Sequence, residues 1–550
     1  EEISNLIADT IKAAATLKRC GFDCVEINAA GENIGQTFMS RNRNKREDDY
    51  GPQTFESRTR FVCEIVRGIK AECGEDFPVQ VLINGVEEND KAIGDNAFFT
   101  TVEENKEMCK LIEAAGADSL HIRIGPCGQH VAEFAGDLYF CGTGIEGTTG
   151  YGTQFDFTRH WQGMLKADQS GLGIMVPVAA EIKKAVSIPV GAVTYMDPAR
   201  DPEFFESLIA SGELDFILMN RPLSVDYDYL HKLEEGRIDE IRPCTRCMHC
   251  HWDAADDGNL TFSCRTNAAH PFRFVTGQLT GSYDPEPAAT AKNVIVVGAG
   301  PAGLEAARVA AERGHSVTLY EKKGSVGGLL EFANNVKGPH ENLSVLRSYF
   351  ERQMEVLGVN VMLNTEATAD IIAEASPDIV IAATGGVRDT LGLSDTAGTK
   401  VVGIDDFMMA DIAEEVVIVG SNVQAIDAAM YLLAQGKHVQ VVTPNAASAI
   451  GAGHSFWVKT FTQPNMKALG VRFWPEATVT AVNDGSVTVK TATGIEQEIA
   501  CGTVVEALDC LPNDSLSTGL SCEVVTVGDA ARPFNIGEAI CSGNAAARAI

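Results

Sequence analysis

Four cysteines near the middle of the chain constrain its fold and chemistry more than any other feature. Three are spaced as C-x2-C-x2-C and the fourth comes after thirteen intervening residues: Cys244, Cys247, Cys250 and Cys264, here called the cysteine claw. This spacing is typical of a [4Fe-4S] cluster, which we predict. Zinc is the main alternative, although its usual thiolate frameworks are two separated C-x2-C pairs. Four unrelated buried cysteines are the structural alternative.

The size and charge of the chain limit its class. Its 550 residues are too many for one hydrophobic core and favour about three domains. A formal net charge of −31 disfavours nucleic acid and anionic membranes as partners, and no apolar run is long enough to span a bilayer. Most of the 15 cysteines are scattered singly, so we expect a reduced, cytoplasmic protein. We also expect a small-molecule substrate and a homo-oligomer.

Residues 1–243 alternate short apolar runs with amphipathic helices, which is the pattern of parallel βα units. Helices are predicted at Phe55–Cys73 and Glu103–Ala115. Five strands are predicted, each a near-continuous apolar run: Cys24–Asn28, Val79–Asn84, Ser119–Ile124, Pro189–Val193 and Phe216–Asn220. An eight-stranded barrel would need three more strands before Glu1, and an open five-stranded sheet is the alternative.

Three motifs in this half resemble the flavin barrel of the old yellow enzyme family. They are Gly21-Phe-Asp-Cys-Val-Glu26-Ile27, Asn44-x-Arg46-x-Asp48-x-Tyr50-Gly51 and Glu56-Ser-Arg58-x-Arg60-Phe61. Together with the claw and the domains on its C-terminal side, they make the whole chain resemble the multidomain branch of that family. This branch includes 2,4-dienoyl-CoA reductase, 2-enoate reductases and trimethylamine dehydrogenase.

The resemblance implies an α/β fold with four parts. Residues 1–243 would be an FMN-binding (β/α)8 TIM barrel truncated to strands 4–8, and residues 244–291 an iron–sulfur loop and linker. Residues 292–400 and 510–550 would form an FAD-binding domain, and residues 401–509 an NAD(P)-binding-like domain, both Rossmann-like.

The resemblance assigns Asn220 and Arg221 to FMN, with the guanidinium of Arg221 on the phosphate. A surface arginine that caps a strand end is the alternative. The chain also departs from the family here. It has Leu82 where an arginine often faces the flavin, and the strand that ends at Thr194-Tyr195 lacks another.

The proton donor is the largest departure. Asn33 stands where the dienoyl reductases carry a tyrosine, and an asparagine can polarise a carbonyl but cannot act as an acid. His130 matches a catalytic histidine of those reductases, and a structural role is its alternative. Residues 126–172 form a long aromatic connection in which Tyr139 or Tyr151 would supply the proton. We predict a lid over a bulky, flat substrate, and a small subdomain is the alternative.

A dinucleotide fingerprint comes after the linker Gly277–Ala291. A strand leads into Gly298-Ala-Gly300-Pro-Ala302-Gly303, where a helix N-terminus would bind a pyrophosphate, and Glu321 ends the next strand, where ribose hydroxyls bind. The predicted FAD-binding residues are Gly298, Gly300, Ala302, Gly303, Glu321, Gly328, Gly385 and Asp529.

The insert at residues 401–509 carries an altered second fingerprint, Gly420-Ser-Asn422-Val-Gln424-Ala425, with Asn and Ala where glycine is usual. We predict that the strand and helix persist while nucleotide binding through Gly420 and Asn422 is weaker. The next strand ends at Thr443-Pro444 with no arginine nearby for a 2′-phosphate, which favours NADH over NADPH.

These features predict an NADH-dependent flavin oxidoreductase. Electrons would pass from NADH through FAD, the cluster and FMN to an activated C=C bond of an enone, enoate or enoyl thioester. An amine dehydrogenase or N-demethylase is an alternative. The spacing of the claw, the missing tyrosine and the altered fingerprint favour it, whereas the chain lacks the barrel tyrosine and histidine of the amine enzyme. A non-enzymatic electron-transfer or assembly subunit is the third possibility.

Overall fold

The computed structural model describes residues 1–88, 95–125, 172–251, 253–254, 260–261, 263–270, 273, 277, 279–337, 341–455, 458–459, 463–464, 466–467, 469–516 and 520–550. The chain separates into two compact units, the first ending at Asn220 and the second running from Arg221 to Ile550. Residues 221–243, which the sequence pattern assigns to the barrel, pack with the second unit.

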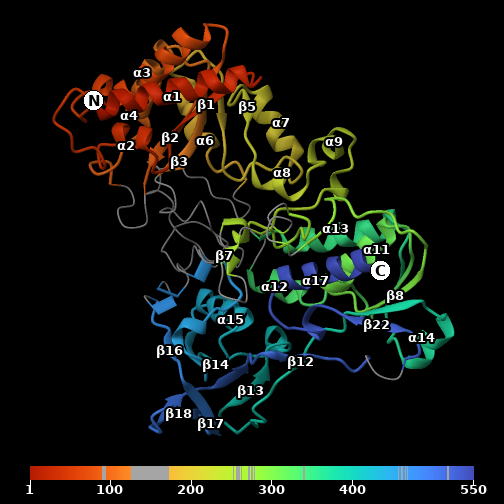
Figure 1. The fold of residues 1–550 in the computed structure, drawn as a ribbon. Helices are drawn as coiled ribbons and strands as arrows, with labels where there is room; N and C mark the ends of the chain where they lie inside the picture. The colour runs from red at the N-terminus through yellow and green to blue at the C-terminus, as the bar shows by residue number, and fades with distance from the viewer. Residues whose placement is uncertain are drawn as a thin grey trace. The chain divides into compact units, whose positions relative to one another are not determined.

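The first unit contains a parallel sheet whose strands are neighbours in chain order (Figure 1). Its strands are β1 (Val25–Ala29), β2 (Val79–Glu87), β3 (Ser119–Gly125), β4 (Val190–Ala192) and β5 (Phe216–Ile217). Its helices are α1 (Glu2–Arg19), α2 (Ile34–Met39), α3 (Phe55–Cys73), α4 (Val102–Ala114), α6 (Val176–Lys183) and α7 (Pro202–Ala210). This order of strand and helix is that of a (β/α)8 barrel. The five predicted strands and the two predicted helices are confirmed.

Local sequence explains these elements. Alternate residues of β2 and β3 are fully buried, namely Val79, Val81, Ile83, Leu120, Ile122 and Ile124. Helices α3, α4 and α6 lie against this sheet, so one side of it is an apolar core. Thr54 and Thr101 begin α3 and α4 with capping boxes, in which each threonine side chain accepts the N–H of the third helical residue.

The second unit holds two parallel sheets. The first has the order β10-β9-β8-β11-β22. Its strands are β8 (Asn293–Val297), β9 (Ser316–Tyr320), β10 (Asn360–Met362), β11 (Ile379–Ala382) and β22 (Glu523–Thr526). Because β22 pairs with β11, the end of the chain returns to the sheet that starts at residue 293. Helix α17 (Ile536–Ala549) lies beside α11 (Pro301–Glu312) in Figure 1.

The other sheet of this unit has the order β13-β20-β14-β15-β16. Its strands are β13 (Lys400–Gly403), β14 (Glu415–Val419), β15 (His438–Val442), β16 (Arg472–Trp474) and β20 (Thr503–Glu506). Helix α15 (Val423–Ala434) comes after β14, and an antiparallel sheet, β17 (Ala477–Asn483), β18 (Ser486–Thr491) and β19 (Glu496–Ala500), is inserted before β20. The predicted α/β class with Rossmann-like sheets is confirmed, and the domain boundaries stay predictions.

No helix among the described residues is long and apolar enough to cross a bilayer.

Candidate functional site

The claw lies in an irregular loop between α9 (Tyr229–Glu234) and β8. Arg246 and Met248, which separate its first three cysteines, have left-handed φ values of 53° and 60°. Non-glycine residues are rarely left-handed, and such strain persists where the surroundings impose it, often at functional sites. Turns of this kind also point successive backbone N–H groups into one concavity, as in many iron–sulfur and phosphate sites.

The four thiols lie near enough to one another to interact electrostatically. Burial raises the pKa of Cys244 to about 11, and it also raises the pKa of Cys247 and Cys250. Among the described residues, however, no group of three or more His, Cys, Asp or Glu side chains is arranged to hold a metal ion. A zinc ion would need thiolates at about 2.3 Å. A [4Fe-4S] cluster would take the same four thiolates as ligands. The cluster in the claw stays a prediction.

Arg242 precedes the first cysteine of the claw and contacts both the segment after its last cysteine and the first nucleotide-binding fold. Its guanidinium donates to the carbonyl of Thr266, two residues after Cys264, and lies 3.2 Å from the carboxylate of Glu305 on α11. It also lies 5.0 Å from the ring centre of Tyr349. A buried charge is tolerated only when it is paired in this way.

A second set of buried charges leads from the claw to the other sheet. Arg265 pairs with Glu341 at 2.8 Å, and Glu341 pairs with Lys337 at 3.2 Å, at the end of α12 (Leu330–Lys337). Lys337 pairs with Asp427 of α15 at 2.9 Å, and Asp427 lies 3.0 Å from His454. These five side chains, here called the charge chain, are all buried.

The first fingerprint has the geometry of a nucleotide cradle. Gly298 has a φ of 100°, and a Cβ there would lie 2.3 Å from the carbonyl oxygen of Ala383. A Cβ on Gly303 would lie 1.9 Å from the carbonyl oxygen of Gly298, which explains why a side chain is excluded at the helix–strand contact. A Cβ on Gly300 would meet nothing within 4 Å, so the space before α11 is open.

The other predicted FAD residues surround this cradle. Glu321 accepts the N–H groups of Ala299 and Lys323, both at 2.8 Å, and each of its carboxylate oxygens keeps a lone pair for a ribose hydroxyl. The buried hydroxyl of Thr384, next to Gly385, has no partner among the described residues.

Two glycine segments pack directly on α11: one at Gly328, and one at Gly528 and Asp529, just after β22. A Cβ on Gly328 would lie 3.1 Å from the Cα of Gly300, and one on Gly528 would lie 2.7 Å from the Cβ of Ala302. Burial raises the pKa of the neighbouring Asp529. The orphaned hydroxyl of Thr384 and the open space at Gly300 together fit an FAD-like dinucleotide.

The second fingerprint keeps its strand–turn–helix form. Gly420 has a φ of 140°, and a Cβ there would lie 2.0 Å from the carbonyl oxygen of Ala507. Asn422 is the N-cap of α15 and accepts the N–H of Ala425.

The residues predicted for FMN and catalysis are only partly described. His130, Tyr139 and Tyr151 lie outside the described residues. Asn33 is exposed at the start of α2, and its amide donates to the carbonyl of Ala30 at 2.9 Å. Arg221 begins α8 (Arg221–Val225) and lies 3.0 Å from the sulfur of Met248 in the claw. The FMN roles of Asn220 and Arg221 stay predictions.

Sequence reasoning missed several polar contacts between distant parts of the chain. In the first unit His121 of β3 lies 2.8 Å from Glu26 of β1, and Asn84 accepts the N–H of Gly31 at 2.9 Å. Arg265 comes directly after Cys264, and this adjacency would have indicated a cation close to the claw. The pairing of Lys337 with Asp427 joins residues 90 positions apart, and no local pattern indicates it.

Comparison with known proteins agrees with this arrangement. Residues 1–125 match the NADH:flavin oxidoreductase / NADH oxidase family, and residues 292–529 match the pyridine nucleotide-disulphide oxidoreductase family. The chain is 34% identical over 448 residues to an NADH oxidase of Thermoanaerobacter brockii. It is 31% identical over 452 residues to a cinnamate reductase of Clostridium sporogenes. Each match covers 80% of this chain and 61% of the relative, so the chain spans about six-tenths of their length.

Among solved structures, 2-naphthoyl-CoA reductase in complex with 2-naphthoyl-CoA has a TM-score of 0.80 and 29% identity to the chain. The match covers 100% of this chain and 76% of that one. Proteins named as amine dehydrogenases or demethylases are also similar to the chain.

Replacing Glu305 should destabilise the protein in a pH-dependent way. Burial opposes ionisation of Glu305, but Arg242 and Arg308 outweigh it and lower its pKa to about 2. The carboxylate therefore contributes stability at neutral pH that is lost as the pH falls from about 4.5 towards 2. We expect Glu305→Gln to cost about 3–5 kcal/mol at pH 7 and less in acid, measured as the difference in Tm from wild type.

Glu312→Gln is the control for this variant, because Glu312 pairs with Arg308 while being 36% exposed, and its loss should change Tm little. A Tm difference between wild type and Glu305→Gln that is independent of pH would contradict the assignment.

The contribution of the charge chain to stability can be tested by replacing Lys337 and Asp427 separately and together. Lys337→Met leaves Asp427 buried beside His454 without its main cation, and we expect a loss of about 3–5 kcal/mol. Lys337→Met combined with Asp427→Leu should recover part of this lost stability, because an apolar pair then replaces a buried carboxylate without a cation. Thermal unfolding of wild type, the two single variants Lys337→Met and Asp427→Leu, and the double variant gives the coupling, and a strictly additive double variant would argue against a direct pair.

Proposed function

Because the chain belongs to the multidomain NADH:flavin oxidoreductase family, we propose that it is an NADH-dependent ene-reductase. Its substrate would be an activated C=C bond in an enone, enoate or enoyl thioester. Relatives named as reductases of cinnamate and of 2-naphthoyl-CoA support this class, because the double bonds in both are conjugated with a carboxylate or a thioester.

The observation that carries the proposal is the anchoring of the claw. Arg242 links both ends of the claw to Glu305, which lies on the helix that starts at the first fingerprint. A redox centre held in the claw would therefore keep a fixed place relative to a flavin held at Gly300. Fixed placement of cofactors is the main contribution a protein makes to their redox chemistry.

We assign three binding roles to the residues of the first fingerprint, the claw and the segment at Asn220. Gly298, Gly300, Gly303, Glu321 and Thr384 would hold FAD. The claw would hold a [4Fe-4S] cluster, with the cations of Arg221 and Arg265 near its thiolates. Asn220 and Arg221 would bind FMN. When bound, the flavins would supply two-electron chemistry and the cluster one-electron transfer between them.

The substrate proton is assigned to His130 or Tyr139. Asn33 is exposed and cannot act as an acid, so its role would be to orient a substrate carbonyl by hydrogen bonding. This would require its amide to leave the carbonyl of Ala30.

An amine dehydrogenase is the second candidate. Similar relatives named for dimethylamine and for N,N-dimethylglycine and sarcosine favour it. So does Asn422 in the second fingerprint, because a weak nucleotide site suits an enzyme that receives its electrons from the organic substrate.

Anaerobic stopped-flow absorbance distinguishes the two candidates. We expect excess NADH to bleach the flavin absorbance of the full-length protein, and an enoate such as cinnamate to restore it. Cys247→Ala should still bleach with NADH, but recovery with the enoate should be nearly abolished. The control is Cys522→Ala, which removes a half-buried free cysteine outside the claw and should behave like wild type. Bleaching by a tertiary amine, with no response to NADH, would rule out the ene-reductase and favour the amine dehydrogenase.

A further inference from the structure

The two fingerprints of the second unit differ at the start of the helix that would face a pyrophosphate. In the first, the N-cap of α11 is Gly300, which has no side chain to cap the helix. The free backbone N–H groups and the positive end of the helix dipole are what bind an anion at this position. Because a Cβ on Gly300 would meet nothing within 4 Å, a ligand phosphate can approach the backbone.

In the second fingerprint the same position is taken by Asn422. Its side-chain oxygen accepts the N–H of Ala425 at 2.9 Å, so one of the free donors of α15 is already used. Its amide nitrogen donates to the carbonyls of Ala507 and Leu508 at 3.1 and 3.2 Å and to the carboxylate of Asp509 at 3.1 Å. The side chain is therefore held between the start of α15 and the segment after β20.

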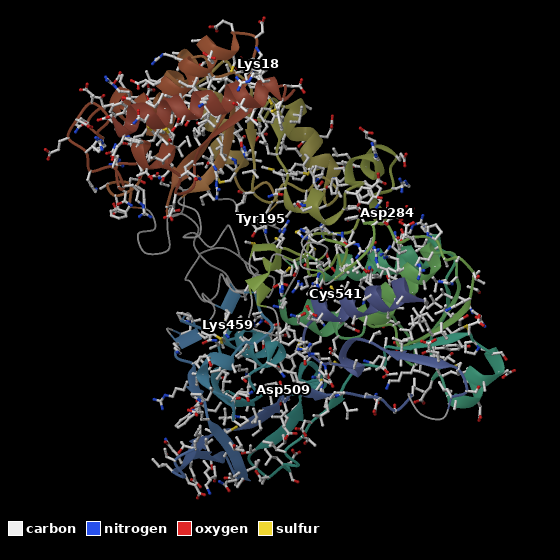
Figure 2. The ribbon with its side chains drawn as sticks, in the orientation of Figure 1. Lys18, Tyr195, Asp284, Lys459, Asp509 and Cys541 are labelled. Carbon is white, nitrogen blue, oxygen red and sulfur yellow. The ribbon has the colours of Figure 1, made fainter. Side chains whose placement is uncertain are left out.

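A negative charge stands beside this helix end. Asp509, labelled in Figure 2, is exposed in the segment between β20 and β21 (Cys510–Leu511). Its carboxylate is fixed by the amide of Asn422. A pyrophosphate at the N-terminus of α15 would meet this like charge as well as the capped helix.

The side chains that follow β15 are also engaged in contacts within the protein. The hydroxyl of Thr443 donates to the hydroxyl of Ser421 at 3.0 Å, and the amide of Asn445 donates to the same oxygen at 3.1 Å. Ser421 in turn accepts the N–H of Gly451 through its carbonyl at 2.7 Å. At this position a dinucleotide-binding fold usually presents a side chain to the ribose, whereas here Thr443 is fully buried.

We propose that Asn422 is an internal plug that occupies the anion position of the second nucleotide fold and sets a weak affinity for nicotinamide dinucleotides. Asp509 strengthens the effect because its carboxylate opposes the same phosphates. This inference rests on the proposed function, in which NADH is the electron donor. It adds a specificity-determining residue to that site and predicts that the wild-type protein has a high KM for NADH.

The test measures binding of NADH and NAD+ to the full-length protein by anaerobic calorimetry, without turnover. Asn422→Gly restores the open helix end, and glycine is itself an acceptable N-cap, so the fold should persist. We expect roughly tenfold tighter binding, because the released N–H of Ala425 can donate to a phosphate and hydrogen bonds to charged groups are among the stronger ones. Asn422→Asp keeps the cap but adds a negative charge, and it should bind more weakly than wild type. In steady state, Asn422→Gly should lower KM for NADH more than it changes kcat.

The reciprocal variant is Gly300→Asn. Gly300 has a φ of −76° and open space before it, so the asparagine fits without backbone strain and installs the same plug at the FAD site. We expect this variant to be purified with less FAD than wild type. Equal NADH affinity in wild type and Asn422→Gly, or full FAD retention in Gly300→Asn, would overturn the proposal. Binding is independent of turnover, so a protein that reduces no C=C bond would refute the proposed function and leave this comparison intact.

Discussion

The second unit depends on the pairing of buried charges around the claw. Arg242 and Arg265 lie within two residues of claw cysteines, and both are at least nine-tenths buried. A cation in that position is stable only when an anion is buried with it, and Glu305 and Glu341 are those anions. Because both carboxylates belong to the first nucleotide fold, the claw cannot shift without separating buried charges.

The charge chain extends this constraint to the second nucleotide fold. Lys337 stands between Glu341 and Asp427, so one cation holds α15 against the fold that bears the first fingerprint. Asp427 lies two residues after Ala425, whose N–H group Asn422 caps. The same short segment of α15 therefore carries both the contact that positions the second fold and the residue that we propose to limit its affinity for nucleotides.

The sequence predicted the ends of a helix correctly where capping residues mark them. Both ends of α3 agree with the prediction, because Thr54 caps its start and Gly74 comes after its end with a φ of 94°. Strand β4 spans three residues, whereas five were predicted, because an apolar run marks a strand but not the hydrogen bonds that end it. The substitution at Asn422 is visible in the sequence, but the direction in which its amide turns is not. That direction depends on Ala507 and Leu508, which are more than eighty residues away.

The central claim is that the claw holds an iron–sulfur cluster that passes electrons between two flavins. Its most direct test is the iron and acid-labile sulfide content of full-length protein purified without oxygen, compared with the Cys247→Ala variant. Our account predicts about four irons and four sulfides per chain in wild type and their loss in the variant. It also predicts a paramagnetic signal in the electron paramagnetic resonance spectrum after reduction. Stoichiometric zinc in wild type, or an iron content unchanged by Cys247→Ala, would contradict it.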